Sequence, residues 1–213
     1  YKSLNELTYL SLRTFATVIS RHIVRDDFII FSDNTTDDES TILYNGEEVT
    51  TIANKNLGNR FIHGYSIDGF SYFSRSLKLN GSLSYVKGDE NETYGPMPSI
   101  SPIFGTISGE YTKDKIKISA LYKFSGDKSP KDYSLGGEDG LEETPVITEN
   151  SNGIIYAGTP KWSDFSIYTN YDISEDVKIR IALTNIFDNH YRTFASGISA
   201  PGRSFQIGLY LKL

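Results

Sequence analysis

The last eleven residues decide the fold, and they read Arg203-Ser-Phe-Gln-Ile-Gly-Leu-Tyr-Leu-Lys-Leu213. From residue 205 onwards every odd position is apolar, and the even positions are mostly polar or small. Because successive side chains of a β-strand point to opposite faces, this alternation predicts a strand with one apolar face. The side chains on that face are Phe205, Ile207, Leu209, Leu211 and Leu213.

The same two-residue period covers most of the 213-residue chain, whereas no segment has convincing helical spacing. Residues 177–183 read Val-Lys-Ile-Arg-Ile-Ala-Leu, and residues 77–83 read Leu-Lys-Leu-Asn-Gly-Ser-Leu. The pattern predicts an all-β protein. We expect eight strands, at about 8–31, 60–73, 77–86, 103–111, 115–124, 164–173, 177–191 and 203–213.

The connections between these strands alternate in length. Short polar turns are expected near 74–76, 112–114 and 174–176, and long loops at about 32–60, 86–102, 125–163 and 192–202. Outer-membrane barrels have short periplasmic turns and long external loops. A soluble β-sandwich has no reason to sort its loops in this way. We therefore expect a transmembrane antiparallel β-barrel, and the sandwich is the alternative.

Composition excludes several classes of protein. The absence of Cys excludes a disulfide scaffold, a thiolate zinc site and a Cys nucleophile. The net charge of −6 argues against a partner held by phosphate contacts, so no nucleic acid is expected. No motif nominates a catalytic residue, a metal site or a cofactor, and the three His (His22, His63 and His190) are far apart in sequence.

Acidic residues concentrate in two of the long loops. Segments 32–59 and 125–163 together hold thirteen acidic and four basic side chains, a net charge of −9. The chain as a whole carries −6, so the remainder carries +3. Such loops disfavour anionic ligands and attract cationic ones.

The residues before the last strand carry a family resemblance. Residues 185–191 read Asn-Ile-Phe-Asp-Asn-His-Tyr, and residues 196–203 read Ser-Gly-Ile-Ser-Ala-Pro-Gly-Arg. This pair of strings closely resembles the C-terminal end of TonB-dependent outer-membrane receptors. One departure is Leu213, where such barrels usually end in an aromatic residue. The residues that match the family pattern are Asn185, Phe187, Asp188, Tyr191, Gly197, Pro201, Gly202 and Arg203.

The resemblance implies a larger protein. The family's barrel has 22 strands around an N-terminal plug domain, so residues 1–213 would form about the last eight strands, without the plug. The chain opens at Tyr1 rather than Met, which also leads us to expect part of a longer or processed protein. The implied partners are the plug and earlier strands of the same receptor, the TonB-ExbB-ExbD system, outer-membrane lipid or lipopolysaccharide, and a surface lipoprotein.

The resemblance also implies a function. It indicates TonB-dependent transport of a bulky, scarce nutrient across the outer membrane of a Gram-negative cell. Iron-siderophore, haem and cobalamin cargoes are expected. Two alternatives stay open, namely a free-standing small outer-membrane barrel acting as an adhesin or structural protein, and a secreted soluble β-sandwich binding module.

Several single residues have candidate roles. Asn185 lies at an apolar-parity position, which indicates a β-bulge or the upper membrane boundary. Arg203 is expected to bond loop carbonyls or to face lipopolysaccharide. His190 and Tyr133 are candidate ligand contacts in the loops, and His190 has the alternatives of a haem ligand and an ordinary boundary histidine. Residues 136–143, rich in Gly and acids, are either a calcium site or a solvated acidic loop.

Overall fold

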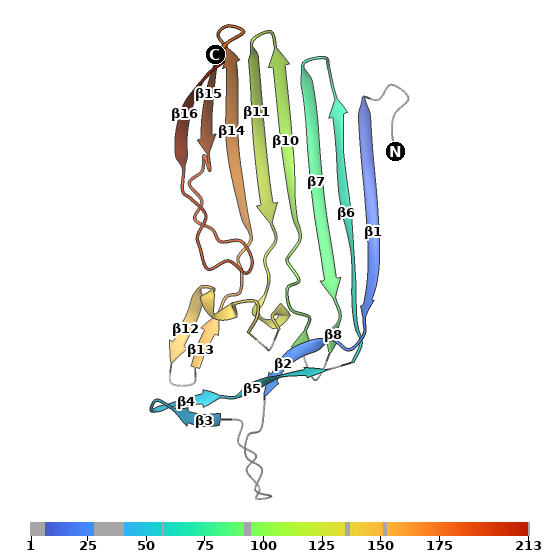
Figure 1. Ribbon diagram of the computed structural model, residues 1–213, viewed down its shortest axis with the longest axis vertical. Coiled ribbons are helices and arrows are strands. Elements are labelled where there is room, and N and C mark those ends of the chain that lie inside the picture. The colour runs from blue at the N-terminus through green and yellow to red at the C-terminus, as the bar shows by residue number, and fades with distance from the viewer. Residues whose placement is uncertain are drawn as a thin grey trace, which may run out of the picture.

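The computed structural model describes residues 7–27, 41–56, 58–91, 95–134, 137–150 and 153–212. Its main body is one eight-stranded antiparallel sheet in which each strand pairs with the next long strand along the chain (Figure 1). The prediction of eight antiparallel strands is confirmed. The strands are β1 (Thr8–Ile19), β6 (Arg60–Tyr72), β7 (Leu77–Gly88), β10 (Phe104–Lys113), β11 (Ile116–Ser125), β14 (Trp162–Asp172), β15 (Val177–Thr184) and β16 (Ser204–Leu211).

Two of the predicted strands are too long. The first ends at Ile19 rather than residue 31, because Arg21 has a φ of 54° and turns the chain out of the sheet. The seventh ends at Thr184 rather than residue 191, because Asn185 has a φ of 47°. A residue in the left-handed region interrupts the extended backbone, and Asn tolerates that conformation better than most residues. Residues 28–31 lie outside the described residues.

The three short turns all lie at one end of the sheet, at the top of Figure 1. Ser74 Oγ accepts hydrogen bonds from the backbone N–H groups of Ser76 and Leu77, at 3.2 and 3.0 Å. Ser174 Oγ accepts from the N–H of Asp176 at 3.3 Å. In these two turns a serine side chain therefore closes the turn by bonding the nearby backbone.

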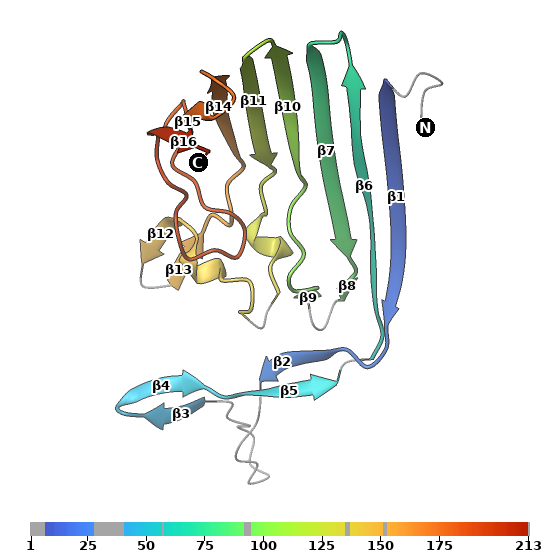
Figure 2. The same cartoon turned by 45° about the horizontal axis from the view of Figure 1, so that its top comes forward.

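The four long connections leave from the opposite end, and they span residues 20–59, 89–103, 126–161 and 185–203. These connections hold small hairpins that the sequence did not predict. The strands of the 20–59 connection project away from the large sheet (Figure 2). The hairpins are β2 (Ile23–Asp27) with β5 (Ile52–Asn56), β3 (Thr41–Tyr44) with β4 (Glu47–Thr50), β8 (Glu90–Asn91) with β9 (Gly95–Pro96), and β12 (Val146–Asn150) with β13 (Gly153–Tyr156). Two single 3₁₀ turns, η1 (Pro130–Asp132) and η2 (Leu141–Glu143), lie in the 126–161 loop.

One face of the large sheet is apolar and exposed. The strand register pairs Leu12 with Ile67, Ile67 with Leu83, and Ile181 with Ile207, so apolar side chains form rows across the sheet. Leu12 is 64% exposed and Ile207 is 68% exposed. In a soluble sandwich a second sheet would cover such a face. The other sheets in the described residues are two-stranded hairpins of the loops, which argues against the sandwich alternative.

The opposite face of the sheet is polar. Ion pairs join Arg13 to Asp68 at 3.0 Å and Lys117 to Glu110 at 2.6 Å. Ser82 Oγ lies 2.7 Å from Thr106 Oγ1 on the next strand. A face of paired charges and hydroxyl groups is typical of a wall that lines a water-filled lumen.

Both edges of the sheet lack a partner within the described residues, because β1 and β16 stand at opposite ends of the strand order. A free-standing eight-stranded barrel would need these two strands to pair, so the structure does not support that alternative. An open edge exposes unpaired backbone groups and needs further strands to cover it in a bilayer.

Among the described residues, no helix is long and apolar enough to cross a membrane.

Candidate functional site

A buried ion pair organises the end of the molecule that carries the long loops. Lys128 Nζ lies 3.0 Å from Asp139 Oδ2, and the two side chains are 4% and 2% exposed. Lys128 Nζ also donates to the carbonyl of Ile100 at 2.7 Å, and Asp139 Oδ1 accepts from the N–H of Ser99 at 2.7 Å. The pair therefore ties the 126–161 loop to the 89–103 loop.

Aromatic rings from two loops pack around the ammonium group of this pair. Lys128 Nζ lies 4.0 Å from the ring centroid of Phe194 and 5.0 Å from that of Tyr133, which are cation–π distances. The Tyr133 hydroxyl lies 2.6 Å from Thr159 Oγ1. Burial lowers the pKa of the Lys128 ammonium, and Asp139 opposes this shift. Phe194 brings the 185–203 loop to the same point, and we call Lys128, Asp139, Tyr133 and Phe194 the loop core.

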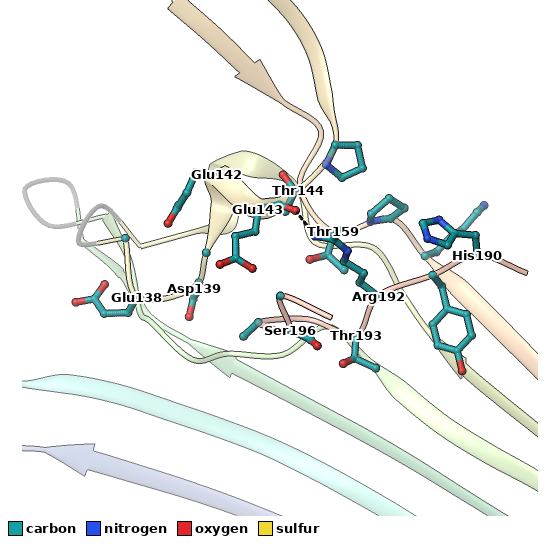
Figure 3. A pocket seen from close by; sticks show the side chains of 18 residues that line it. Glu138, Asp139, Glu142, Glu143, Thr144, Thr159, His190, Arg192, Thr193 and Ser196 are labelled. Carbon is teal, nitrogen blue, oxygen red and sulfur yellow. Dashed lines mark hydrogen bonds between the residues drawn. The ribbon is translucent and has the colours of Figure 1, made fainter. Parts of the chain in front are cut away.

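A cavity of about 520 Å³ lies beside the loop core, between the 126–161 and 185–203 loops (Figure 3). Its volume falls within the range of ligand pockets, roughly 300–1,000 Å³. The charged and titratable side chains on its wall, besides Asp139 of the loop core, are Glu138, Glu142, Glu143, Lys161, His190, Tyr191 and Arg192.

Two contacts fix the geometry of the cavity wall. Arg192 Nη1 donates to the carbonyl of Glu143 at 3.0 Å, and its Nε donates to Ser199 Oγ at 3.2 Å. A Cβ on Gly197 would lie 2.6 Å from Oε2 of Glu143, so a larger residue there would push that carboxylate aside. Figure 3 shows Glu138 and Asp139 at one end of the cavity and His190 at the other, with Arg192 between them on the His190 side.

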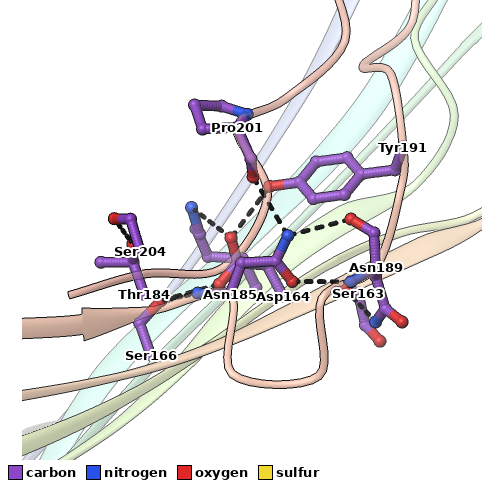
Figure 4. A network of polar contacts seen from close by, with 10 residues as sticks. Ser163, Asp164, Ser166, Thr184, Asn185, Asn189, Tyr191, Pro201 and Ser204 are labelled. Atoms are coloured by element: carbon purple, nitrogen blue, oxygen red, sulfur yellow. Dashed lines mark hydrogen bonds and ion pairs between the residues drawn. The ribbon is translucent and has the colours of Figure 1, made fainter.

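Beside the cavity, a second network includes Asn185, Asn189 and Tyr191 of the Asn-Ile-Phe-Asp-Asn-His-Tyr string (Figure 4). Asn185 is 2% exposed, and its Nδ2 donates to the carbonyls of Asn189 at 2.9 Å and Pro201 at 3.1 Å. Its Oδ1 accepts from the N–H of Asn189 at 3.0 Å. Asn185 therefore holds the end of β15 against the segment that leads into β16.

Three other residues of the pattern extend this network. Asp188 Oδ1 accepts from the N–H of Arg203 at 2.7 Å, and Oδ2 lies 3.7 Å from its guanidinium. Tyr191 stacks on Trp162 with ring centroids 4.3 Å apart, and its hydroxyl donates to Asp164 Oδ2 at 2.9 Å. Arg203 was expected to bond loop carbonyls or to face lipopolysaccharide, and the contact that the structure gives it is with Asp188.

The structure separates the candidate ligand contacts. His190 lies on the cavity wall, whereas Tyr133 is 3% exposed within the loop core, which removes its side chain from direct contact with a ligand in this conformation. Gly197 also lines the cavity, and Phe187 is exposed and stacks on Phe165. Gly202 lies against Asp188, since a Cβ there would be 3.0 Å from Oδ1. Leu213 lies outside the described residues, and Phe205, Ile207, Leu209 and Leu211 are exposed along β16.

The 137–143 segment does not gather metal ligands. Asp139 is committed to Lys128, and in the described part of the chain no group of three or more His, Asp or Glu is placed to hold a metal ion.

The sequence did not single out Lys128, Phe194 or Arg192. No signal in the sequence marks them, because the contacts of Lys128 with Asp139 and Phe194, and of Arg192 with Glu143, join residues 11, 66 and 49 positions apart.

Tyr191 supplies a pH prediction. Burial, together with the hydrogen bond to Asp164 and its charge, raises the pKa of Tyr191 from 10.0 to about 12. The folded state holds this proton more tightly than the unfolded chain does. The contribution of the protonated Tyr191 hydroxyl to the free energy of unfolding is therefore complete below pH about 10, and it is lost as the pH rises through about 12. Tyr191→Phe should remove one high-pH step from the tyrosinate absorbance titration, and an unchanged titration would contradict this assignment.

Comparisons with known proteins give matches of structure alone. No family model matches the sequence, and no curated protein matches it. The copper transporter OprC is 14% identical with a TM-score of 0.68, covering 97% of this chain and 30% of its own. The siderophore receptor PirA from Acinetobacter baumannii is 18% identical with a TM-score of 0.65, and the match covers 97% of this chain and 30% of PirA. The ferric-catecholate import receptor Fiu from E. coli K12 is 15% identical with a TM-score of 0.62, covering 99% and 26%.

The chain therefore spans less than a third of the length of these solved structures, while almost all of it matches them. The proteins named are transporters and import receptors rather than enzymes. The resemblance in fold to TonB-dependent outer-membrane receptors is confirmed, as part of a larger barrel.

Proposed function

We propose that this chain forms a section of the barrel wall, with four extracellular loops, of a TonB-dependent receptor in the outer membrane of a Gram-negative cell. The observation that carries the proposal is the large sheet. It has one exposed apolar face, one polar face, two open edges and all its long loops at one end. Lipid would cover the apolar face, and the polar face would line the lumen.

The open edges define the first partner of the chain. Further strands of the same receptor would pair with β1 and β16, since lipid does not tolerate unpaired backbone groups. A plug domain would fill the wide lumen that such a wall encloses. Coupling to the TonB system would pass through that plug, and the 1–213 segment would supply wall and loops.

Within this function we propose a ferric siderophore as the cargo. The proteins of similar fold include a copper transporter, a siderophore receptor and a ferric-catecholate import receptor. Among the cargoes that the sequence resemblance implies, this favours the iron-siderophore class over haem and cobalamin. Of the three histidines, His190 lines the cavity, whereas His22 lies in the 20–59 loop and His63 lies on β6.

Uptake by cells tests the proposal. Cells that carry the full-length receptor, cells that lack it, and cells that lack the TonB system are given radiolabelled ferric siderophores, haem and cobalamin. We expect uptake of at least one ferric siderophore to fall about tenfold or more when either the receptor or the TonB system is absent. Receptor-dependent uptake that persists without TonB would contradict the proposal.

A further inference from the structure

We propose that the cavity between the 126–161 and 185–203 loops binds a protonated amine on the cargo. This inference rests on the proposed function, because it names the chemical class of cargo that the same loops would meet. The cavity of about 520 Å³ would hold an aminoalkyl arm rather than the whole of a bulky chelate.

The carboxylates on the cavity wall are available to a ligand. Glu138, Glu142 and Glu143 line the cavity, and no ion pair between residues that the structure describes engages any of them. Glu138 accepts one hydrogen bond, from Ser134 Oγ at 2.8 Å. The fourth acid, Asp139, is neutralised by Lys128. Three carboxylates without a cationic partner favour a cation, and hydrogen bonds to charged groups are the stronger ones.

The basic side chains occupy a different part of the same cavity. Arg192 is held by Glu143 O and Ser199 Oγ, which leaves other guanidinium N–H groups to donate to a ligand oxygen. Lys161 and His190 also lie on the wall. A ligand that matches this arrangement carries an amine beside an oxygen-rich group, as an amine-bearing ferric hydroxamate does.

The charge of the loops supports the same class of cargo at longer range. The four loops, 20–59, 89–103, 126–161 and 185–203, hold nineteen acidic and eight basic side chains, a net charge of −11. The chain carries −6, so the sheet, its short turns and the termini carry +5. A negative rim raises the local concentration of cations and repels anionic chelates. At physiological salt this effect reaches about 8 Å, so it acts at the loops themselves.

Equilibrium binding to the purified full-length receptor in detergent tests the inference. The probes are a linear ferric trihydroxamate with a terminal amine and the same chelate with that amine acetylated. We expect the wild-type receptor to bind the amine form about tenfold more tightly. The double variant Glu142→Gln/Glu143→Gln should bring the ratio close to one by weakening the amine form alone, and Gly197→Ala should reduce the ratio by displacing Glu143.

The matched control is Glu175→Gln, which removes a carboxylate from the short turn at the other end of the sheet and should leave the ratio unchanged. Equal affinity for the two probes, a preference that survives the double variant, or no saturable binding of either probe would overturn the inference. The measurement uses no energy source. An amine preference without TonB-dependent uptake would therefore overturn the proposed function while leaving the assignment of the cavity as an amine-binding site standing.

Discussion

Lys128→Ala should destabilise the loop end of the molecule by about 3–5 kcal/mol, the cost of leaving one member of a buried ion pair without its partner. The substitution leaves the Asp139 carboxylate 2% exposed with no counter-charge, and it removes the cation that Phe194 and Tyr133 surround. The N–H of Ser99 donates to Asp139 and is therefore a local reporter. Hydrogen exchange at Ser99 should speed up by a factor of about 100 or more.

Two further variants make this result specific to the buried pair. The double variant Lys128→Met/Asp139→Asn should recover most of the lost protection, because it removes both buried charges and keeps an Oδ1 acceptor for the N–H of Ser99. Lys131→Ala, an exposed lysine of the same loop, should change exchange little. Protection at Ser99 that survives Lys128→Ala would show that the pair does not hold the loops together.

Asn185→Ala should lower the free energy of unfolding by about 3 kcal/mol or more. The side chain makes three hydrogen bonds in a buried position, and each buried group left without a partner costs about 1–3 kcal/mol. Alanine would also have to adopt the left-handed φ of 47°, which costs about 1 kcal/mol. The measurement is urea unfolding of the full-length receptor refolded in lipid vesicles.

Two variants separate these two costs. Asn185→Gly tolerates the left-handed conformation and should be about 1 kcal/mol less destabilising than Asn185→Ala. Asn170→Ala, on the polar face of β14, is the control and should stay within about 0.5 kcal/mol of the wild type. Equal, small effects of Asn185→Ala and Asn170→Ala would show that the buried network contributes little.

The large sheet could be predicted from the sequence because its information is local. The alternation in residues 203–213 and 177–183 sets which side chains share a face, and short polar turns set which strands are neighbours. The strand ends were less predictable. The polar Asn185 interrupts the apolar alternation before Phe187, but its left-handed φ, which ends β15, could not be predicted because alternation alone does not report φ.

The loop contacts could not be predicted because they join residues far apart in the chain. Lys128 looks like any other loop lysine until Asp139, Ile100 and Phe194 surround it. Tyr133 was expected at a ligand, but its hydroxyl bonds Thr159, 26 residues later, and its ring is buried. The two strings that carry the family resemblance, residues 185–191 and 196–203, were informative in a different way. Their residues contact one another, as Asn185, Asn189 and Pro201 do.

The central claim is that this sheet is a wall of an outer-membrane barrel with its long loops outside the cell. The 213 residues contain no Cys, so single-cysteine labelling reports on them cleanly. Glu149→Cys, exposed in the β12–β13 hairpin, and Glu175→Cys, exposed in a short turn, are made separately in the full-length receptor. In intact cells a membrane-impermeant maleimide should label position 149, and position 175 only after the outer membrane is permeabilised. Equal labelling of both positions in intact cells, or labelling of position 175 alone, would contradict the account.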